Sequence, residues 1–194
     1  MKRYTFIIVA ILVAIAVFFI VTYNSLIKKE EAVKKQWSEV QATYQRRIDL
    51  IPSLVNVVKG QADFESTTLL QITEARNKAA AVTISGDEIA AGKFNQQVKL
   101  QDDLASAANK LLISLEAFPA LKGTAAFAGL QAQLEGTERR IKFARKDFNE
   151  AIASYNNSVR NFPAKIVAGM FGFKPREGFQ SDTGANKSIE INFN

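Results

Sequence analysis

The stretch FAGLQAQLEGTERRIKFARKDFNEAIASYNNSVRNF, residues 127–162, carries the strongest structural signal in the chain. One row of large, mostly aromatic side chains recurs every seven residues: Phe127, Leu134, Ile141, Phe148, Tyr155 and Phe162. A second row of mostly small residues lies between them: Leu130, Thr137, Ala144, Ala151 and Ser158. Two rows at this spacing are the a and d positions of a coiled-coil seam. The segment is therefore expected to form a long helix that packs on other helices.

Three more amphipathic helices are expected upstream of this one. The first continues from an apolar N-terminal stretch to Ile51, because residues 22–51 contain neither Pro nor Gly. It is expected to end there, since Pro52 disfavours helical geometry at the residue before it. The second begins at Pro52 and ends near Val82, before the turn sequence TISGD. The third runs from about residue 87 to Phe118.

Each of these three helices carries an apolar stripe at helical spacing. The first stripe is Leu26, Val33, Trp37, Val40, Tyr44 and Ile48. The second is Leu54, Val58, Ala62, Leu69, Ile72, Ala79 and Val82. The third is Phe94, Val98, Leu104, Ala108, Leu111, Leu115 and Phe118. Four such helices with short connections predict an all-α fold, with an antiparallel up-and-down four-helix bundle over residues 24–162. Only SIEINF, residues 188–193, alternates as a short strand would.

The N-terminus has the pattern of a transmembrane helix. Phe6–Val21 is an unbroken apolar run, and Tyr4 and Tyr23 bracket it. Roughly twenty helical residues span about 30 Å, the thickness of the hydrocarbon core, and tyrosines favour its two interfaces. A cleaved signal peptide has a shorter apolar region and then small residues, whereas the bulky Phe18–Val21 stands at that place here. Residues 1–23 are therefore expected to be an uncleaved anchor that contacts the lipid bilayer through residues 4–23.

The basic residues beside the anchor give opposing signals about its orientation. Lys2 and Arg3 favour a cytoplasmic N-terminus, whereas four lysines within residues 28–35 favour a cytoplasmic body. Long downstream domains cross the membrane largely regardless of charge. An extracytoplasmic body is therefore expected, with a cytoplasmic body as the alternative.

The composition excludes several classes of chemistry. The 194-residue chain has no Cys and no His, so it has no thiolate nucleophile, imidazole base, disulfide or His or Cys metal ligand. It also lacks a Walker phosphate loop, a Gly-rich dinucleotide fingerprint and a nucleophile elbow. No cofactor, metal site or catalytic residue is expected. The net charge of +6 favours anionic membranes or acidic partners, but no nucleic-acid signature accompanies it.

In an up-and-down bundle, YQRRIDLIPS (44–53) and EAFPALKG (116–123) both lie at the end far from the membrane. The charged residues expected at this tip are Arg46, Arg47, Asp49, Glu116 and Lys122. The two arginines would occupy the last turn of the first helix, where cations interact favourably with the helix dipole. Two interpretations stay open. The charges form a structural ion network, with Glu135 nearby, or they form a docking surface for a protein.

The segment after the fourth helix would lie near the membrane. FPAKIVAGMFGFKP, residues 162–175, is apolar and contains only two charged residues. It either rests in the lipid interface, with Phe171 and Phe173 toward lipid and Lys165 and Lys174 toward headgroups, or it folds back and caps the bundle. REGFQSDTGANKS, residues 176–188, is polar and is expected to be mobile. Residues 163–194 would thus be an apolar segment followed by a mostly flexible tail.

Several of these stretches resemble the LemA family. They are YQRRIDLIPSLVNVVKG, ITEARNKA, EAFPALKG and LEGTERRIKFARKDFNEAIASYNNSVRNFPAKIVAGMFGF. The resemblance covers nearly the whole chain, from Tyr23 to Phe173. It implies an antiparallel four-helix bundle behind an N-terminal membrane segment or signal sequence, in bacteria. It implies no biochemical activity and supplies no catalytic residues. Lipoprotein-like members of the family imply an extracytoplasmic body, although this chain has no lipoprotein cysteine.

These features together predict a single-pass, membrane-anchored scaffold or adaptor in the bacterial cytoplasmic (inner) membrane. It would act through protein–protein interaction with a partner that the sequence does not identify. Formation of a homo-oligomer, through a leftover apolar stripe or through the span, stays open. The alternatives are an adaptor with a cytoplasmic body and a hydrolase that uses only carboxylate, hydroxyl or Lys and Arg groups.

Overall fold

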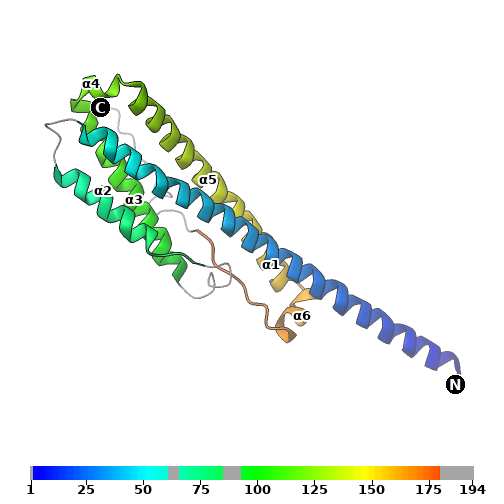
Figure 1. Cartoon of the computed structure of the whole chain (residues 1–194). Helices are drawn as coiled ribbons and strands as arrows, with labels where there is room; N and C mark the ends of the chain where they lie inside the picture. Colours follow the sequence, from blue (N-terminus) through cyan, green and yellow to red (C-terminus); the bar gives the residue numbers. More distant parts are fainter. Residues whose placement is uncertain (1, 61–65, 85–92, 180–194) are drawn as a thin grey trace, which may run out of the picture.

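The computed structural model describes residues 2–60, 66–84 and 93–179, and within these ranges the chain is helical and contains no strand (Figure 1). The elements are α1 (Lys2–Lys59), α2 (Ser66–Ala80), α3 (Lys93–Ser114), the 3₁₀-helix η2 (Leu115–Ala117), α4 (Pro119–Lys122), α5 (Ala125–Arg160) and α6 (Ala164–Met170). The expected strand at residues 188–193 and the expected start of the third helix near residue 87 lie outside the described residues.

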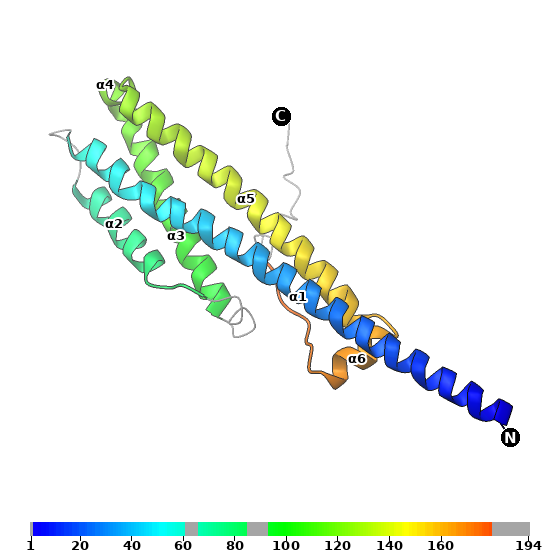
Figure 2. The ribbon, with the colours of Figure 1, turned by 45° about the vertical axis from the view of Figure 1, so that its right-hand side comes forward.

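Helix α1 joins the apolar N-terminus to the body without a break. It has 58 residues, which corresponds to about 87 Å at 1.5 Å per residue. Its side chains are mostly exposed from Tyr4, which is 74% exposed, to Val21, which is 62% exposed. From Leu26 onward one face is buried. The exposed apolar part of α1 therefore projects beyond the other helices, as Figure 2 shows.

The expected helix end before Pro52 is wrong, because α1 continues through Pro52 to Lys59. Proline has no N–H, so the carbonyl of Ile48 lacks its normal helical donor. Arg76 of α2 supplies a replacement: its Nε donates to the Ile48 carbonyl at 3.4 Å. Tertiary contact with α2 thus compensates for the missing hydrogen bond, and residues 52–59 belong to α1 rather than to the second helix.

Consecutive long helices run in opposite directions, as Figures 1 and 2 show. Helix α5 packs along α1, and α2 packs mainly on α3 and less extensively on α1. Helices α3 and α5 are not packed closely together, and a groove of about 740 Å³ lies between them. Small and apolar side chains line it, among them Ala105, Ala108, Leu112 and Leu134.

Two apolar clusters form the core. The proximal cluster, nearer the N-terminus, centres on Trp37, Phe94 and Phe148. The distal cluster includes Leu54, Leu104 and other residues of α1, α2, α3 and the α4–α5 turn. All six residues of the first predicted stripe are buried: Leu26, Val33, Trp37, Val40, Tyr44 and Ile48.

The row of large residues in the predicted seam of α5 is buried except at its C-terminal end, and Leu130 of the second row is half-buried. Its first five large residues are buried: Phe127, Leu134, Ile141, Phe148 and Tyr155. Phe162 is 82% exposed, because α5 ends at Arg160 and Asn161 is already extended. Ile152 and Val159 are buried in place of Ala151 and Ser158. From Leu134 to Phe148 the intervals between successive buried residues alternate between three and four residues, whereas after Phe148 they are four, three and four. The extra interval of four residues is a stutter, which locally unwinds a coiled coil.

We expect Pro52→Ala to raise the free energy of unfolding by about 1–3 kcal/mol, because alanine restores the N–H that α1 lacks at this point. Chemical denaturation of the detergent-solubilised chain measures the change. Ser53→Ala is the matched control, since Ser53 is also exposed on α1, and it should change the value by less than about 0.5 kcal/mol. A destabilised Pro52→Ala variant would contradict this account of the helix.

Candidate interaction site

The structure separates the five residues that the sequence placed together at the tip. Glu116 in η2 and Lys122 in α4 do lie in the turn between α3 and α5, and both are exposed. Arg46 and Arg47 lie about 18 Å before the end of α1, because that helix does not stop at Ile51. Asp49, also on the side of α1, accepts a hydrogen bond from Gln45 at 2.8 Å.

The expected ion network at the tip is therefore wrong. Within the part of the chain that the structure describes, no ion pair joins Glu116 or Lys122 to the arginines. Arg46 is exposed on α1, and it lines a shallow hollow with residues of α5, including Arg140. Arg47 points inward instead and is 1% exposed. Glu135 accepts a hydrogen bond from Gln131 on its own helix.

Arg47 is the centre of a polar layer between the two apolar clusters. Its Nη1 donates to the carbonyl of Gln101 on α3 at 2.6 Å, and its Nη2 donates to Glu138 Oε2 on α5 at 2.7 Å. Charge-assisted bonds of this kind are the stronger hydrogen bonds in proteins. One guanidinium therefore links α1, α3 and α5 where α3 and α5 are otherwise apart.

A second arginine in the layer connects the same three helices. Arg145 Nε of α5 donates to Tyr44 Oη of α1 at 3.0 Å, and its Nη2 donates to Asp102 Oδ1 of α3 at 2.6 Å. Burial raises the pKa of the Tyr44 hydroxyl, and the positive charge of Arg145 opposes this rise. The pKa of Arg145 is raised, with Tyr44 and Asp102 favouring its charged form against the effect of burial. The two arginines therefore fix the register of the three helices, although the buried Nε of Arg47 has no hydrogen-bond partner among the described residues.

The membrane-proximal segment has features of both expected interpretations. Val167 and Ala168 of α6 are buried, and the Tyr23 ring lies 4.8 Å from Phe171 and 5.8 Å from Phe173. This side caps the lower end of the α1–α5 pair, and Phe173 is half-buried in it. Apolar side chains are also exposed here, namely those of Phe162, Ile166, Met170 and, in part, Phe171. Lys165 and Lys174 are exposed beside them.

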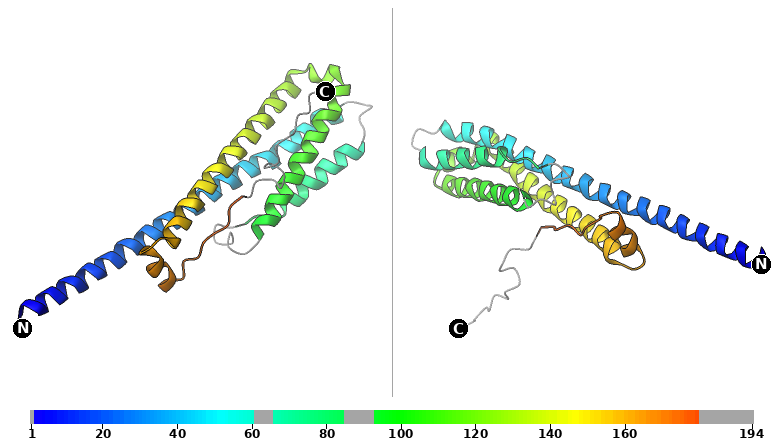
Figure 3. Two further views of the ribbon diagram at one scale, coloured as in Figure 1. Left: turned by 180° about the vertical axis from the view of Figure 1, so that it is seen from behind. Right: turned by 90° about the horizontal axis from the view of Figure 1, so that it is seen from below.

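The segment after α6 is the least expected part of the structure. Residues 171–179 run between α5 and α3 toward the body, as Figures 1 and 3 show. Two asparagines of α5 hold its main chain. Asn156 accepts from the Arg176 N–H and donates to the Arg176 carbonyl, both at 2.8 Å. Asn149 accepts from the Phe179 N–H at 2.8 Å and donates to its carbonyl at 3.1 Å.

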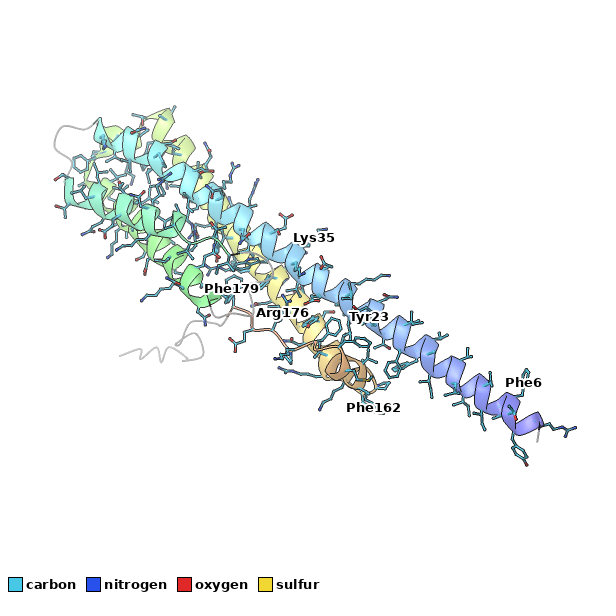
Figure 4. The ribbon with its side chains drawn as sticks, turned by 60° about the horizontal axis from the view of Figure 1, so that its bottom comes forward. Phe6, Tyr23, Lys35, Phe162, Arg176 and Phe179 are labelled. Carbon is cyan, nitrogen blue, oxygen red and sulfur yellow. The ribbon has the colours of Figure 1, made fainter. Side chains whose placement is uncertain are left out.

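Side chains of this segment also enter the body. Arg176 Nη2 donates to Glu30 Oε1 at 2.6 Å, and its guanidinium lies over the Tyr155 ring. The Phe179 ring contacts three rings of the proximal cluster, at 4.9 Å from Phe94, 5.5 Å from Phe148 and 6.3 Å from Trp37. Figure 4 shows Arg176 and Phe179 directed toward the helices. The expectation of a mobile tail is thus wrong for residues 176–179, and residues 180–188 lie outside the described part.

A sequence signal for this arrangement existed. Asn149 and Asn156 are seven residues apart, and each directly follows a seam residue, Phe148 or Tyr155. Asparagine is unfavourable inside a helix because its side chain competes for backbone hydrogen bonds. Two asparagines at heptad spacing beside a seam therefore indicate a polar contact that recurs along the helix.

Among the described residues, no group of three or more Asp or Glu side chains is placed to hold a metal ion.

We expect Glu138→Ala to lower the free energy of unfolding by about 1–3 kcal/mol, because it leaves the buried Arg47 guanidinium without its carboxylate. Glu150→Ala is the control on the same helix. Its pair with Lys146 is 66% exposed on both sides, so its loss should cost less than about 0.5 kcal/mol. Equal effects of the two variants in chemical denaturation would show that the buried position of Arg47 is irrelevant.

We expect Tyr44 to make stability fall at high pH. Its pKa lies above the ordinary value of 10.0 in the folded chain, so the unfolded chain loses the phenol proton first. The stability from the neutral phenol is present below pH 10 and is lost as the pH rises through the folded pKa. The difference in unfolding free energy between the native chain and Tyr44→Phe should therefore shrink above about pH 10. If this difference in unfolding free energy grows above pH 10 instead, burial does not raise the pKa of Tyr44 in the folded chain.

Comparison of the sequence with known proteins identifies its family. The model of the LemA family matches residues 36–193. The proteins named magnetosome protein MamQ 1 and MamQ 2 of Paramagnetospirillum magneticum are each 22% identical to this chain, over 91% of it and 71% of their own length. Protein LemA of Metamycoplasma hominis is 22% identical, over 84% of this chain and 72% of its own. The family match spans well over half of the sequence, and the chain therefore belongs to the LemA family.

Proposed function

We propose that this protein is a single-pass, membrane-anchored helical scaffold of the bacterial envelope that acts by binding other proteins. The observation that carries the proposal is the continuity of α1. The helix contains one stretch long and apolar enough to cross a membrane, and none of that stretch is buried inside the protein. The same helix then forms the central element of the packed body. The body is thus mounted rigidly on its anchor.

The membrane anchor is supported at its lower boundary by a second feature. Helix α6 packs on α1 and α5 where α1 leaves the body, and its exposed apolar side chains lie beside this point. Apolar side chains flanked by lysines are typical of segments that rest in the lipid interface. In this proposal the interface lies near Tyr23, and the packed body extends away from it.

The family and the relatives support a membrane-associated envelope protein. The names LemA and MamQ do not point to a catalytic activity, and a binding role is our proposal. The MamQ relatives are named as proteins of the magnetosome. The alternating directions of α1, α2, α3 and α5 further support the finer proposal that the body is an up-and-down four-helix bundle. In that arrangement the tip residues Glu116 and Lys122 are the parts farthest from the membrane.

We expect the body to be extracytoplasmic, and single cysteines test this because the chain has none of its own. Ser53→Cys and Ser154→Cys place thiols on exposed positions of the body, and a cysteine in a short extension before Met1 marks the other side. A membrane-impermeant maleimide added to intact cells or spheroplasts should label both body positions, and the N-terminal cysteine only after lysis.

Labelling of the N-terminal cysteine alone would place the body in the cytoplasm and overturn the proposed orientation. The same body cysteines, loaded with a photoactivatable cross-linker, test the binding role in living cells. Discrete cross-linked products that differ between the two positions would support a scaffold with defined contacts. No product from either position would contradict the scaffold.

A further inference from the structure

We propose that the groove between α3 and α5 is a docking site for an extended peptide, and that its occupant is residues 189–193 of the same chain, IEINF. These five residues, called the IEINF segment below, lie outside the part of the chain that the structure describes. The described residues leave the groove open. Three observations identify the occupant: the lining of the groove, the place where the described chain stops, and the sequence of the segment.

The groove exists because side chains between the two helices are short. It has a volume of about 740 Å³, and Ala105 and Ala108 of α3 line it together with Leu112 and Leu134. An alanine side chain is a single methyl group, so it does not fill the space toward a facing helix. Ala105 and Leu112 are only half-buried in the described chain. Apolar side chains that cover this groove would be stabilised by removal of apolar surface from water.

The groove continues a face of α5 that already holds a segment of chain. One row of residues follows this side of the helix at intervals of three and four: 135, 138, 142, 145, 149, 152 and 156. At one end of the row, Asn156 and Asn149 hold the main chain of residues 176–179. At the other end, Glu138 and Glu135 line the groove. A chain that follows the row beyond residue 179 therefore enters the groove.

The described chain stops on its way to the groove, and the residues that follow are long enough to reach it. Residues 173–179 pass first Asn156 and then Asn149, so they advance toward the groove between α5 and α3 (Figure 3). Eleven residues separate Asn149 from Glu138, which is about 16 Å along the helix. Residues 180–188 can extend to about 30 Å. These nine residues bridge the distance, and none of the IEINF segment is counted in this reach.

The spare length is needed because an ion pair stands between residue 179 and the groove. Arg145 of α5 binds Asp102 of α3 there, and its guanidinium lies 4.9 Å from the centre of the Phe179 ring. The Asp102 side chain is 51% exposed. The outer side of the pair is thus open to solvent, and residues 180–188 can pass over it.

The IEINF segment matches the groove in pattern and in length. Ile189, Ile191 and Phe193 alternate with polar residues, so an extended chain directs all three apolar side chains to one side. From residue 189 to residue 193 an extended chain spans about 13 Å. From Ala105 to Leu112 helix α3 rises about 10.5 Å. The match to the LemA family runs through residue 193, so the family model includes the segment together with the helices.

Polar side chains beside the groove can receive the main chain of the segment. Ser106 and Asn109 of α3 and Glu135 and Arg139 of α5 line it and are exposed. An extended peptide needs partners for its N–H and carbonyl groups when it is buried. Side chains of α5 already supply such partners to residues 176 and 179. The same kind of contact would hold the segment in the groove.

This inference goes beyond the proposed function, because it assigns an internal occupant to one surface of the body. An outside partner would have to displace the IEINF segment in order to bind there. The tests use purified, detergent-solubilised chain without other proteins. Their failure therefore leaves the topology and cross-linking results untouched.

The first measurement is the rate at which a maleimide with a bulky dye labels Asn109→Cys, the single thiol of that chain. Position 109 is exposed and lines the groove. Adding Ile189→Asp and Ile191→Asp should speed the labelling at least about tenfold, because carboxylates resist burial in an apolar groove. Asn192→Asp is the matched control. It adds the same charge on the other side of the segment and should leave the rate unchanged.

A second control separates an effect on the groove from an effect on the whole chain. Ser53→Cys is exposed on α1 and does not line the groove. Its labelling rate should be the same with and without the two aspartates. Circular dichroism verifies that each variant is folded.

The second measurement adds the segment as a separate peptide. A fluorescent peptide of residues 186–194 should bind the Ile189→Asp, Ile191→Asp chain with saturation, as measured by fluorescence anisotropy. It should bind the native chain at least about tenfold more weakly, because the attached segment competes at a high effective concentration. Ala105→Leu in the first chain should fill the groove and weaken binding. Ala128→Leu, exposed on α5 outside the groove, is the control and should not.

Three outcomes would overturn the inference. Equal labelling of Asn109→Cys with and without the aspartates would show that the segment does not cover the groove. Peptide binding that is insensitive to Ala105→Leu would place the peptide elsewhere. Protection of Asn109→Cys that is lost on dilution, with a dimer in native mass spectrometry, would assign the groove to a second copy instead of the same chain.

Discussion

The packing of α5 along α1 is the constraint on which the rest of the structure depends. Helix α1 is one unbroken element, and none of its apolar first stretch is buried by the part of the chain that the structure describes. The body must therefore form around its second part. Helix α5 contributes the long seam that covers this part, while α2 and α3 pair with each other and α2 also packs on α1. The position of every other element follows from this pair.

The polar layer explains how a loosely packed pair of helices, α3 and α5, is held in register. Apolar packing is non-directional, and it would allow sliding along the groove between them. Arg47 and Arg145 provide fixed donors to specific atoms of α3. Arg47 also bonds to Glu138 of α5, and Arg145 belongs to that helix. These ion pairs join a buried or partly buried arginine to a half-exposed carboxylate. They add directional constraint, although such pairs contribute little net stability compared with apolar residues of the same size.

The lower end of the body combines two kinds of contact. Helix α6 exposes apolar side chains beside the point where α1 leaves the body, and in the proposed function these side chains rest in the lipid interface. Residues 173–179 then turn back toward the body, where the side-chain amides of Asn149 and Asn156 hold their main chain. The same stretch of chain thus closes the body beside the exposed part of α1.

The sequence by itself determined the helical class, the apolar N-terminal helix and the residues that are buried along α1 and most of α5. These features depend on the local periodicity of apolar residues, which can be read directly from the amino-acid sequence. It did not determine where α1 ends, because the lost hydrogen bond at Pro52 is replaced by Arg76 of another helix. The sequence also did not predict that Arg47 is buried, or that Arg176 and Phe179 lie against α5. Those outcomes depend on groups that are distant in sequence, and only the tertiary structure brings their donors, acceptors and rings together.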